Sequence, residues 1–275
     1  MRISPAEPLP GAIMMEVNIK GVNKGDVGIW NTQITFGGTA DTSISNTCEN
    51  QDTTNCRSAY LGLYLTPSSS AYVQNVWVWT ADHNLDGGTR LTMISTGRGI
   101  LVKSTVATWL VGTGSEHHWL YNYNFDYAQN IFAGMMQVET PYNQGSGAVL
   151  LAPAPWVANL AIGDPDFHWC NGGDGKCRSA VANNINGGSN LYLYSSVAWG
   201  FFDGPWDGEY GGDHWCQGNC QTNMNRVSGQ PSGLYWFGIG TKSADVLVLD
   251  GRSNPKELNN PGGWGGIVQN YREFV

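Results

Sequence analysis

Charged side chains are scarce in this chain. They make up 13% of its 275 residues, about half of the ~25% that is usual in soluble domains. The 22 acidic residues outnumber the 14 basic ones, so the net charge is −8. A surface that binds a polyanion needs clustered Lys and Arg side chains to displace counterions, and the sequence contains no such cluster. We therefore expect no nucleic-acid partner.

Long apolar runs are also missing. No stretch of 18 apolar residues is present, so no membrane-spanning helix is expected. The opening segment, MRISPAEPLPGAIMMEVNIK, lacks the continuous apolar region of a secretory signal. No amphipathic pattern is long enough to predict a helix of three turns.

The cysteines lack the spacing and histidine partners of a zinc site. They form three close pairs in loops rich in Gly, Asn and Asp, and we expect three local disulfides: Cys48–Cys56, Cys170–Cys177 and Cys216–Cys220. Disulfides form in oxidising compartments, which predicts an extracellular protein. Because the chain shows no signal, either the signal was removed or the sequence begins within a longer protein.

Glycine, tryptophan and tyrosine are abundant instead, with 37, 12 and 12 residues. Short runs rich in Val, Ile, Leu and Trp alternate with turn residues, which indicates an all-β fold. Predicted strands are 61–65, 76–80, 91–95, 100–102, 109–111, 131–138, 191–194, 234–239 and 246–249. The segment YVQNV at 72–76 is echoed by YAQNI at 127–131. This echo suits a parallel β-helix with an Asn at the same turn of successive coils, but the pattern leaves a β-sandwich or β-propeller open.

Two glutamates stand out in the segment GTGSEHHWLYNYNFDYAQNIFAGMMQVETPYNQ. Glu116 and Glu139 are 23 residues apart, about one coil of a β-helix, which would set their carboxyls on adjacent strands ~4.8 Å apart. Two like charges at that distance cannot both ionise cheaply, so the pKa of one should rise. Paired carboxyls with one raised pKa are typical of glycoside hydrolysis.

Four longer segments, YVQNVWVWTADHNLDGG, GRGILVKS, TWLVGTGSEHHWLYNYNF and GMMQVETPYNQ, resemble the C-terminal half of fungal exo-β-1,3-glucanases of glycoside hydrolase family 55. The resemblance covers nearly the whole chain. It implies a right-handed parallel β-helix over residues 1–252, with an irregular tail over 253–275. The family pairs two such helices around a cleft, so the resemblance also implies an N-terminal β-helix partner that has no counterpart in this sequence.

The resemblance further implies inverting hydrolysis of β-1,3-glucan from the chain end, with no cofactor. Glu139 matches the general acid and Glu116 the second acidic residue. Carboxyls one strand apart are nevertheless closer to the ~5–5.5 Å of retaining enzymes than to the ~6.5–9.5 Å of inverting ones. Pro141 should stop the strand and help to aim Glu139 into a cleft.

Four further residues are candidates for binding sugar. Tyr142 and Trp79 offer aromatic faces to the apolar side of a sugar ring, although burial in the core is the usual place for Trp. One ring of the pair His117 and His118 should line the cleft while the other packs, because side chains alternate along a strand; this argues against a shared metal. Asp82 belongs to a polar cluster that a turn explains equally well.

Two other functions stay open. The chain could be a β-glucan-binding fragment without catalytic activity. A polysaccharide lyase is disfavoured, because an anionic substrate needs a cationic groove and this chain is acidic.

Overall fold

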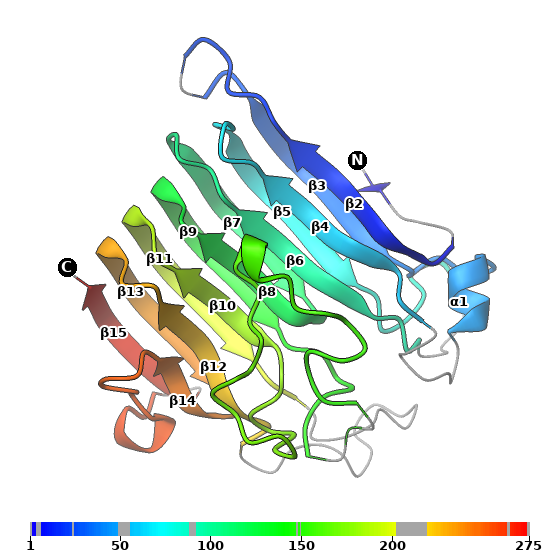
Figure 1. Cartoon of the computed structure of the whole chain (residues 1–275). Helices are drawn as coiled ribbons and strands as arrows, with labels where there is room; N and C mark the ends of the chain where they lie inside the picture. The colour runs from blue at the N-terminus through cyan, green and yellow to red at the C-terminus, as the bar shows by residue number, and fades with distance from the viewer. Residues whose placement is uncertain are drawn as a thin grey trace.

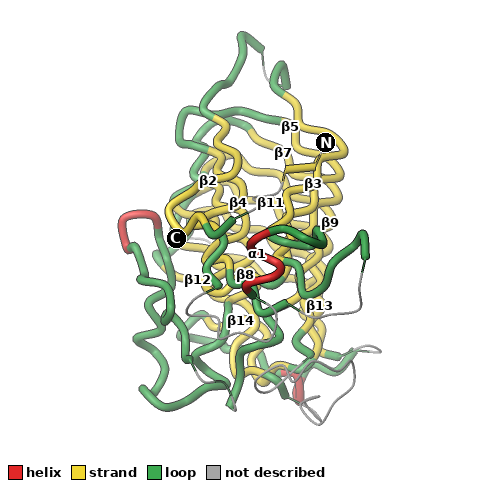
Figure 2. Tube along the Cα trace, turned by 90° about the vertical axis from the view of Figure 1, so that its right-hand side faces the viewer, coloured by secondary structure: helices red, strands yellow, loops and turns green. Residues whose placement is uncertain are grey.

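The computed structural model describes residues 2–3, 7–23, 25–48, 56–87, 92–146, 148, 150–201, 219–262 and 265–273. Within these ranges the chain is almost entirely β-structure (Figures 1 and 2). The only helical elements described are short: α1 (Ser43–Thr47), η1 (Leu160–Ile162) and η2 (Glu257–Asn259). None of the described helices has the length and apolar character needed to cross a bilayer.

The strands form two sheets. The first sheet has the order β1-β3-β5-β7-β9-β11-β13-β15, and the second has the order β14-β12-β10-β8-β6-β4-β2. Strands of the first sheet are β1 (Arg2–Ile3), β3 (Gly28–Phe36), β5 (Tyr72–Thr80), β7 (Thr108–Glu116), β9 (Gln129–Glu139), β11 (Ser189–Trp199), β13 (Ser232–Lys242) and β15 (Gly266–Glu273). Strands of the second sheet are β2 (Leu9–Val17), β4 (Ala59–Leu65), β6 (Thr96–Val102), β8 (His118–Asp126), β10 (Val181–Asn186), β12 (Gln221–Ser228) and β14 (Ala244–Leu249).

From β2 to β15, consecutive strands alternate between the two sheets, as the strand orders and Figure 1 show. All neighbouring strands pair in parallel except β13 and β15, which are antiparallel. The all-β expectation is confirmed, and the alternation is consistent with a parallel β-helix. Apolar side chains from both sheets, such as Phe36, Val78, Ile100 and Trp236, fill one core between them.

A column of residues with positive φ crosses the first sheet. Each lies at the same level of its strand, so the strands change direction together. The column consists of Asn31, Asn75, Gly112, Met135, Ser195 and Gly238. The amide of Asn75 donates to Asn31 Oδ1 at 2.7 Å, so side chains in this column bond along the stack.

The echo between segments 72–76 and 127–131 does not mark equivalent positions. Tyr72 pairs with Trp109, and Trp109 pairs with Phe132 rather than with Tyr127. Asn130 aligns with Asn190 in a different column, whose amide groups bond at 3.1 Å. The predicted repeat was therefore wrong in register, because turn residues recur at two levels of each coil.

Other boundaries also differ from expectation. Within the predicted strand at 91–95, the described residues 92–95 are not part of a strand, and β6 begins at Thr96. The C-terminal tail is not irregular throughout, because β15 pairs with β13.

Strand β8, HWLYNYNFD, was not predicted, although all nine of its residues are buried. Its asparagines satisfy their amides inside the protein, for example Asn124 with the carbonyls of Ile162 and Gly163, so a buried strand carries polar residues.

The three predicted disulfides have three different outcomes. Cys170 and Cys177 are joined, with their Cα atoms 5.6 Å apart. Cys220 is disulfide-bonded, and Cys216 lies outside the described residues. Cys48 and Cys56 are a correction, because both are buried thiols rather than a disulfide. A hydrogen bond between them, together with burial, raises the pKa of Cys48. Sequence spacing brought the two sulfurs together, but it does not fix their oxidation state.

The long connection between β9 and β10, residues 140–180, crosses the outer face of the second sheet (Figure 1). The guanidinium of Arg98 on β6 holds this connection against the second sheet. It donates to both carboxylate oxygens of Asp164, to the carbonyl of Val157 at 3.0 Å, and lies 3.8 Å from the centre of the Tyr60 ring. Both ion-pair side chains are fully buried.

Candidate active site

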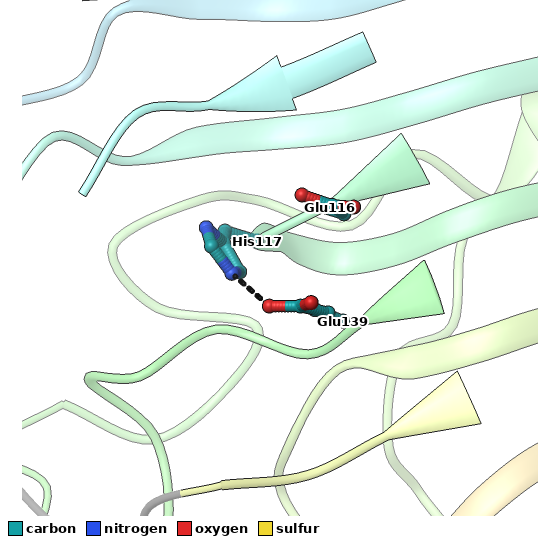
Figure 3. Close-up of side chains that lie close together, drawn as sticks. All are labelled: Glu116, His117 and Glu139. Atoms are coloured by element: carbon teal, nitrogen blue, oxygen red, sulfur yellow. Dashed lines mark hydrogen bonds and ion pairs between the residues drawn. The ribbon is translucent and has the colours of Figure 1, made fainter. Parts of the chain in front are cut away.

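Glu116 and Glu139 are the last residues of β7 and β9, and they stand opposite each other in the first sheet. Both are half-buried, and Figure 3 shows them at the ends of neighbouring strands. Their nearest ligand atoms, together with one nitrogen of His117, lie within 4.8 Å of one another. The expectation that one winding of the chain brings the two carboxyls together is confirmed.

Aromatic side chains flank the pair in the same row. Trp79 on β5 pairs with Glu116, and Trp199 on β11 pairs with Glu139. Trp199 also contacts Phe201, with ring centres 5.2 Å apart. Sequence reasoning missed Trp199 and Phe201, although the alternating pattern of β11 could have placed Trp199 on the outer face.

The carboxyl of Glu139 accepts three hydrogen bonds. His117 Nε2 lies 3.3 Å and the Tyr142 hydroxyl 3.2 Å from Oε2, while Gln137 Nε2 lies 3.4 Å from Oε1. Gln137 was also missed, although it lies two residues before Glu139 and so on the same face of β9.

Burial raises the pKa of Glu116 to about 7. The charge of Glu139 raises this pKa further, whereas His117 and the side chains of Gln137 and Trp77 lower it. The indole N–H of Trp77 has this effect without making a hydrogen bond of normal geometry. One pKa of the pair is therefore raised as expected, and the carboxyl with the raised pKa is the earlier one, Glu116.

His117 and His118 point in opposite directions, but not through alternation along one strand, because His117 lies between β7 and β8. His117 joins β7 to β8 with φ of +64°, and its Nδ1 donates to the carbonyl of Thr80 at 3.0 Å. His118 is buried in the core, where it meets Phe36 edge to face and bonds to Val78 O and Thr80 Oγ1. Burial lowers the pKa of His118 to about 3, so this ring is neutral.

The other predicted sugar-binding residues have different surroundings. Tyr142 is half-buried, and its ring centre lies 4.4 Å from that of His117. Trp79 is only 2% exposed and stacks on Trp77 at 4.8 Å, so its ring is not an open platform. Asp82 is buried beside His83, with the ion pair at 3.1 Å. Together with His117 and Tyr142, Asp82 lines a small pocket next to the carboxyl pair.

The trio of Glu116, His117 and Glu139 has the composition of a metal site. However, both ring nitrogens of His117 already face acceptors, Thr80 O and Glu139 Oε2, and its pKa is raised to about 9. Burial alone would lower this pKa, but the hydrogen bond to Glu139 and the charges of Asp82 and Glu116 outweigh it. A protonated ring has no lone pair for a metal, so we do not assign the trio as a metal site.

The fold is all-β, and its first sheet carries a pair of carboxyls between aromatic side chains. This arrangement defines an all-β protein with a candidate acid–base site for a neutral ligand. Similar proteins of known name belong to a class that fits this description. The chain is 41% identical, over 98% of its length, to a glucan endo-1,3-β-glucosidase of Trichoderma harzianum. It is 32% identical over 88% to a probable glucan endo-1,3-β-glucosidase of Arthroderma benhamiae, and 32% over 87% to a glucan 1,3-β-glucosidase of Cochliobolus carbonum.

These similarities relate the chain to β-1,3-glucanases. The chain spans about a third of the length of these relatives, between 27% and 36%. No family model matches it.

Proposed function

We propose that this chain carries the acid–base site of a β-1,3-glucan hydrolase of the family 55 type. The observation that carries the proposal is the pair Glu116 and Glu139, in register on adjacent strands with one raised pKa. The names of the relatives support β-1,3-glucan as the substrate. The scarcity of charge and the flanking Trp199 and Phe201 suit a neutral sugar, whose C–H faces pack on aromatic rings.

In this proposal Glu139 gives its proton to the glycosidic oxygen, the role that the family resemblance assigns to it. The single raised pKa favours a second assignment, in which Glu116 holds the proton near neutral pH. An aryl β-glucoside with a good leaving group separates the assignments, because it needs no proton donor: the variant of the true donor, Glu→Gln, should retain activity on it and lose activity on laminarin.

We propose inversion at the anomeric carbon and release of glucose from the chain end. Ligand atoms of the two glutamates within 4.8 Å leave little room for water between them, compared with ~6.5–9.5 Å in inverting enzymes. The attacking water would therefore be held by groups outside this pair. NMR of the first product decides: α-glucose supports inversion, whereas β-glucose indicates retention. Longer oligosaccharides as first products would contradict the exo mode, and two of the relatives carry endo names.

The proposal includes an N-terminal β-helix partner and an extracellular location. A row of partly exposed aromatic side chains on the outer face of the first sheet supports such a partner, since an apolar surface of this kind suits packing against another domain. The row runs through neighbouring strands in register: Tyr72, Trp109, Phe132, Tyr192 and Tyr235. Phe132 and Tyr192 are 38% and 39% exposed. The disulfide Cys170–Cys177 supports an oxidising compartment.

Glucose release from laminarin by the chain, compared with its Glu139→Gln variant, tests the function. We expect release by the wild type and at least a ~100-fold loss in the variant. Equal release by both proteins would dismiss catalysis at this site. Binding of laminarin without release by either protein would favour the non-catalytic glucan-binding alternative, and activity of the chain alone would contradict a strict need for the N-terminal partner.

A further inference from the structure

The two oxygens of the Glu139 carboxyl have different partners. Oε2 receives both His117 Nε2 at 3.3 Å and the Tyr142 hydroxyl at 3.2 Å. Oε1 has a single described partner, Gln137 Nε2 at 3.4 Å, which is near the limit for a hydrogen bond. Figure 3 shows the His117 ring directed at one end of this carboxyl.

His117 is itself fixed on several sides. Its backbone N–H donates to the backbone carbonyl of Glu139 at 2.8 Å, so backbone and side chain both reach the same residue. Its Nδ1 donates to Thr80 O at 3.0 Å, and the side chain is only 7% exposed. A positive φ is costly for a residue of this size, and such strain persists where the surrounding structure requires it.

Tyr142 closes the other side of this arrangement. Its ring centre is 4.4 Å from the His117 ring and 5.8 Å from the Phe201 ring, which it meets edge to face. The hydroxyl therefore reaches Glu139 from a ring that is packed between two other rings. Both donors on Oε2 are held in place before any ligand arrives.

We propose that His117 and Tyr142 are positioning residues that clamp Oε2 of Glu139 and leave Oε1 as the oxygen that exchanges a proton. This inference rests on the proposed function and changes the role of both residues, from contacts with sugar to supports of the carboxyl. A proton on Oε2 would face two donors, whereas a proton on Oε1 faces only the weak Gln137 contact. The clamp thus fixes which lone pair of the carboxyl points at the glycosidic oxygen.

The charges around His117 agree with this geometry. Groups that face it are Asp82 and His83 from the loop after β5, Glu116 at the end of β7, the buried His118, and Glu139 and Tyr142 from β9 and the loop after it. Three of these are carboxyls, and they hold the pKa of His117 at about 9. Its ring is then an imidazolium at neutral pH, with N–H groups for both Thr80 O and Glu139 Oε2.

Side-chain NMR tests the clamp without any substrate. Long-range ¹H–¹⁵N spectra follow each histidine of the full chain during a pH titration. In Glu139→Gln the pKa of His117 should fall by about one or more, because the hydrogen bond that raises it most is lost. Glu16→Gln, at an exposed position on β2, is the matched control and should leave His117 unchanged. A His117 titration that is the same in wild type and Glu139→Gln would overturn the clamp.

Kinetics on laminarin test its consequence. Tyr142→Phe should lower kcat roughly 10-fold, and His117→Gln roughly 10- to 100-fold, with KM nearly unchanged, as for lost hydrogen bonds to a charged group. His168→Gln, which removes an exposed histidine paired with Asp166, is the control for the second variant. A rise in KM with unchanged kcat would show that these side chains bind sugar and would refute the positioning role. Wild-type chain without activity would count against the proposed function alone, since the NMR titration still decides the clamp.

Discussion

Glu116→Gln should stabilise the protein above neutral pH and have little effect in mild acid. Burial raises the pKa of Glu116 from 4.5 to about 7 in the folded protein. The folded chain therefore binds this proton more tightly than the unfolded chain does. The resulting stability is fully present below pH 4.5 and is lost as the pH rises through 7. Glutamine has no proton to lose, so the variant avoids this loss.

The magnitude follows from the difference of about 2.5 in pKa, at ~1.36 kcal/mol for each pKa unit, which gives about 3 kcal/mol above pH 8. The attraction of the His117 cation already lowers this pKa, so the figure of about 3 kcal/mol includes it. A buried ionisable group in a functional site commonly lowers the free energy of unfolding by an amount of this order.

Chemical denaturation of both proteins at pH 4 and pH 8.5 measures the effect. The free energies of unfolding should agree at pH 4 within about 0.5 kcal/mol, and that of the variant should be larger by about 3 kcal/mol at pH 8.5. Glu16→Gln, which removes an exposed carboxyl, controls for the change of net charge. The same difference at both pH values would refute the reasoning, because it would not come from ionisation of Glu116.

Three further predictions concern buried groups. The pKa of His118 is lowered from 6.5 to about 3, so its stability contribution is present above pH 6.5 and is lost as the pH falls towards 3; His118→Leu should flatten this acid limb in denaturation experiments. Arg98→Met should lower the free energy of unfolding by about 3–5 kcal/mol, because it leaves the buried Asp164 carboxylate without its ion-pair partner. Adding Asp164→Leu should recover most of this loss, and a double variant as unstable as the single one would contradict the reasoning. Cys48 and Cys56 should react with a thiol reagent only after unfolding, and rapid reaction of the native protein would show that they are not buried.

Part of the fold could be read from local patterns. Runs such as those of β5, β9 and β11 alternate apolar and polar residues, and the inward positions are buried as the alternation requires. Strands β8 and β10 could not be found in this way, because they carry asparagines that bond to other buried groups: Asn183, for example, donates to Asn225 at 2.7 Å. A side-chain amide can be buried when another part of the chain supplies a hydrogen-bond partner. That partner is distant in the sequence, so a short segment read alone does not reveal it.

The candidate site shows the same division. The spacing of Glu116 and Glu139 followed from strand geometry and is present in the structure. The opposite directions of His117 and His118 instead arise where β7 ends and β8 begins. The position of Trp79 on its strand did not reveal that its ring is buried, because the burial comes from stacking against Trp77.

The sequence by itself determined that this is a β protein of low charge with two carboxyls one coil apart. Chain connectivity and the two-residue period of a strand suffice for that. Only the tertiary structure decided which carboxyl has the raised pKa and what holds the other. Desolvation of Glu116, and the donors that His117 and Tyr142 present to Glu139, arise from groups that the fold brings together, and their effects depend on distance and burial rather than on order along the chain.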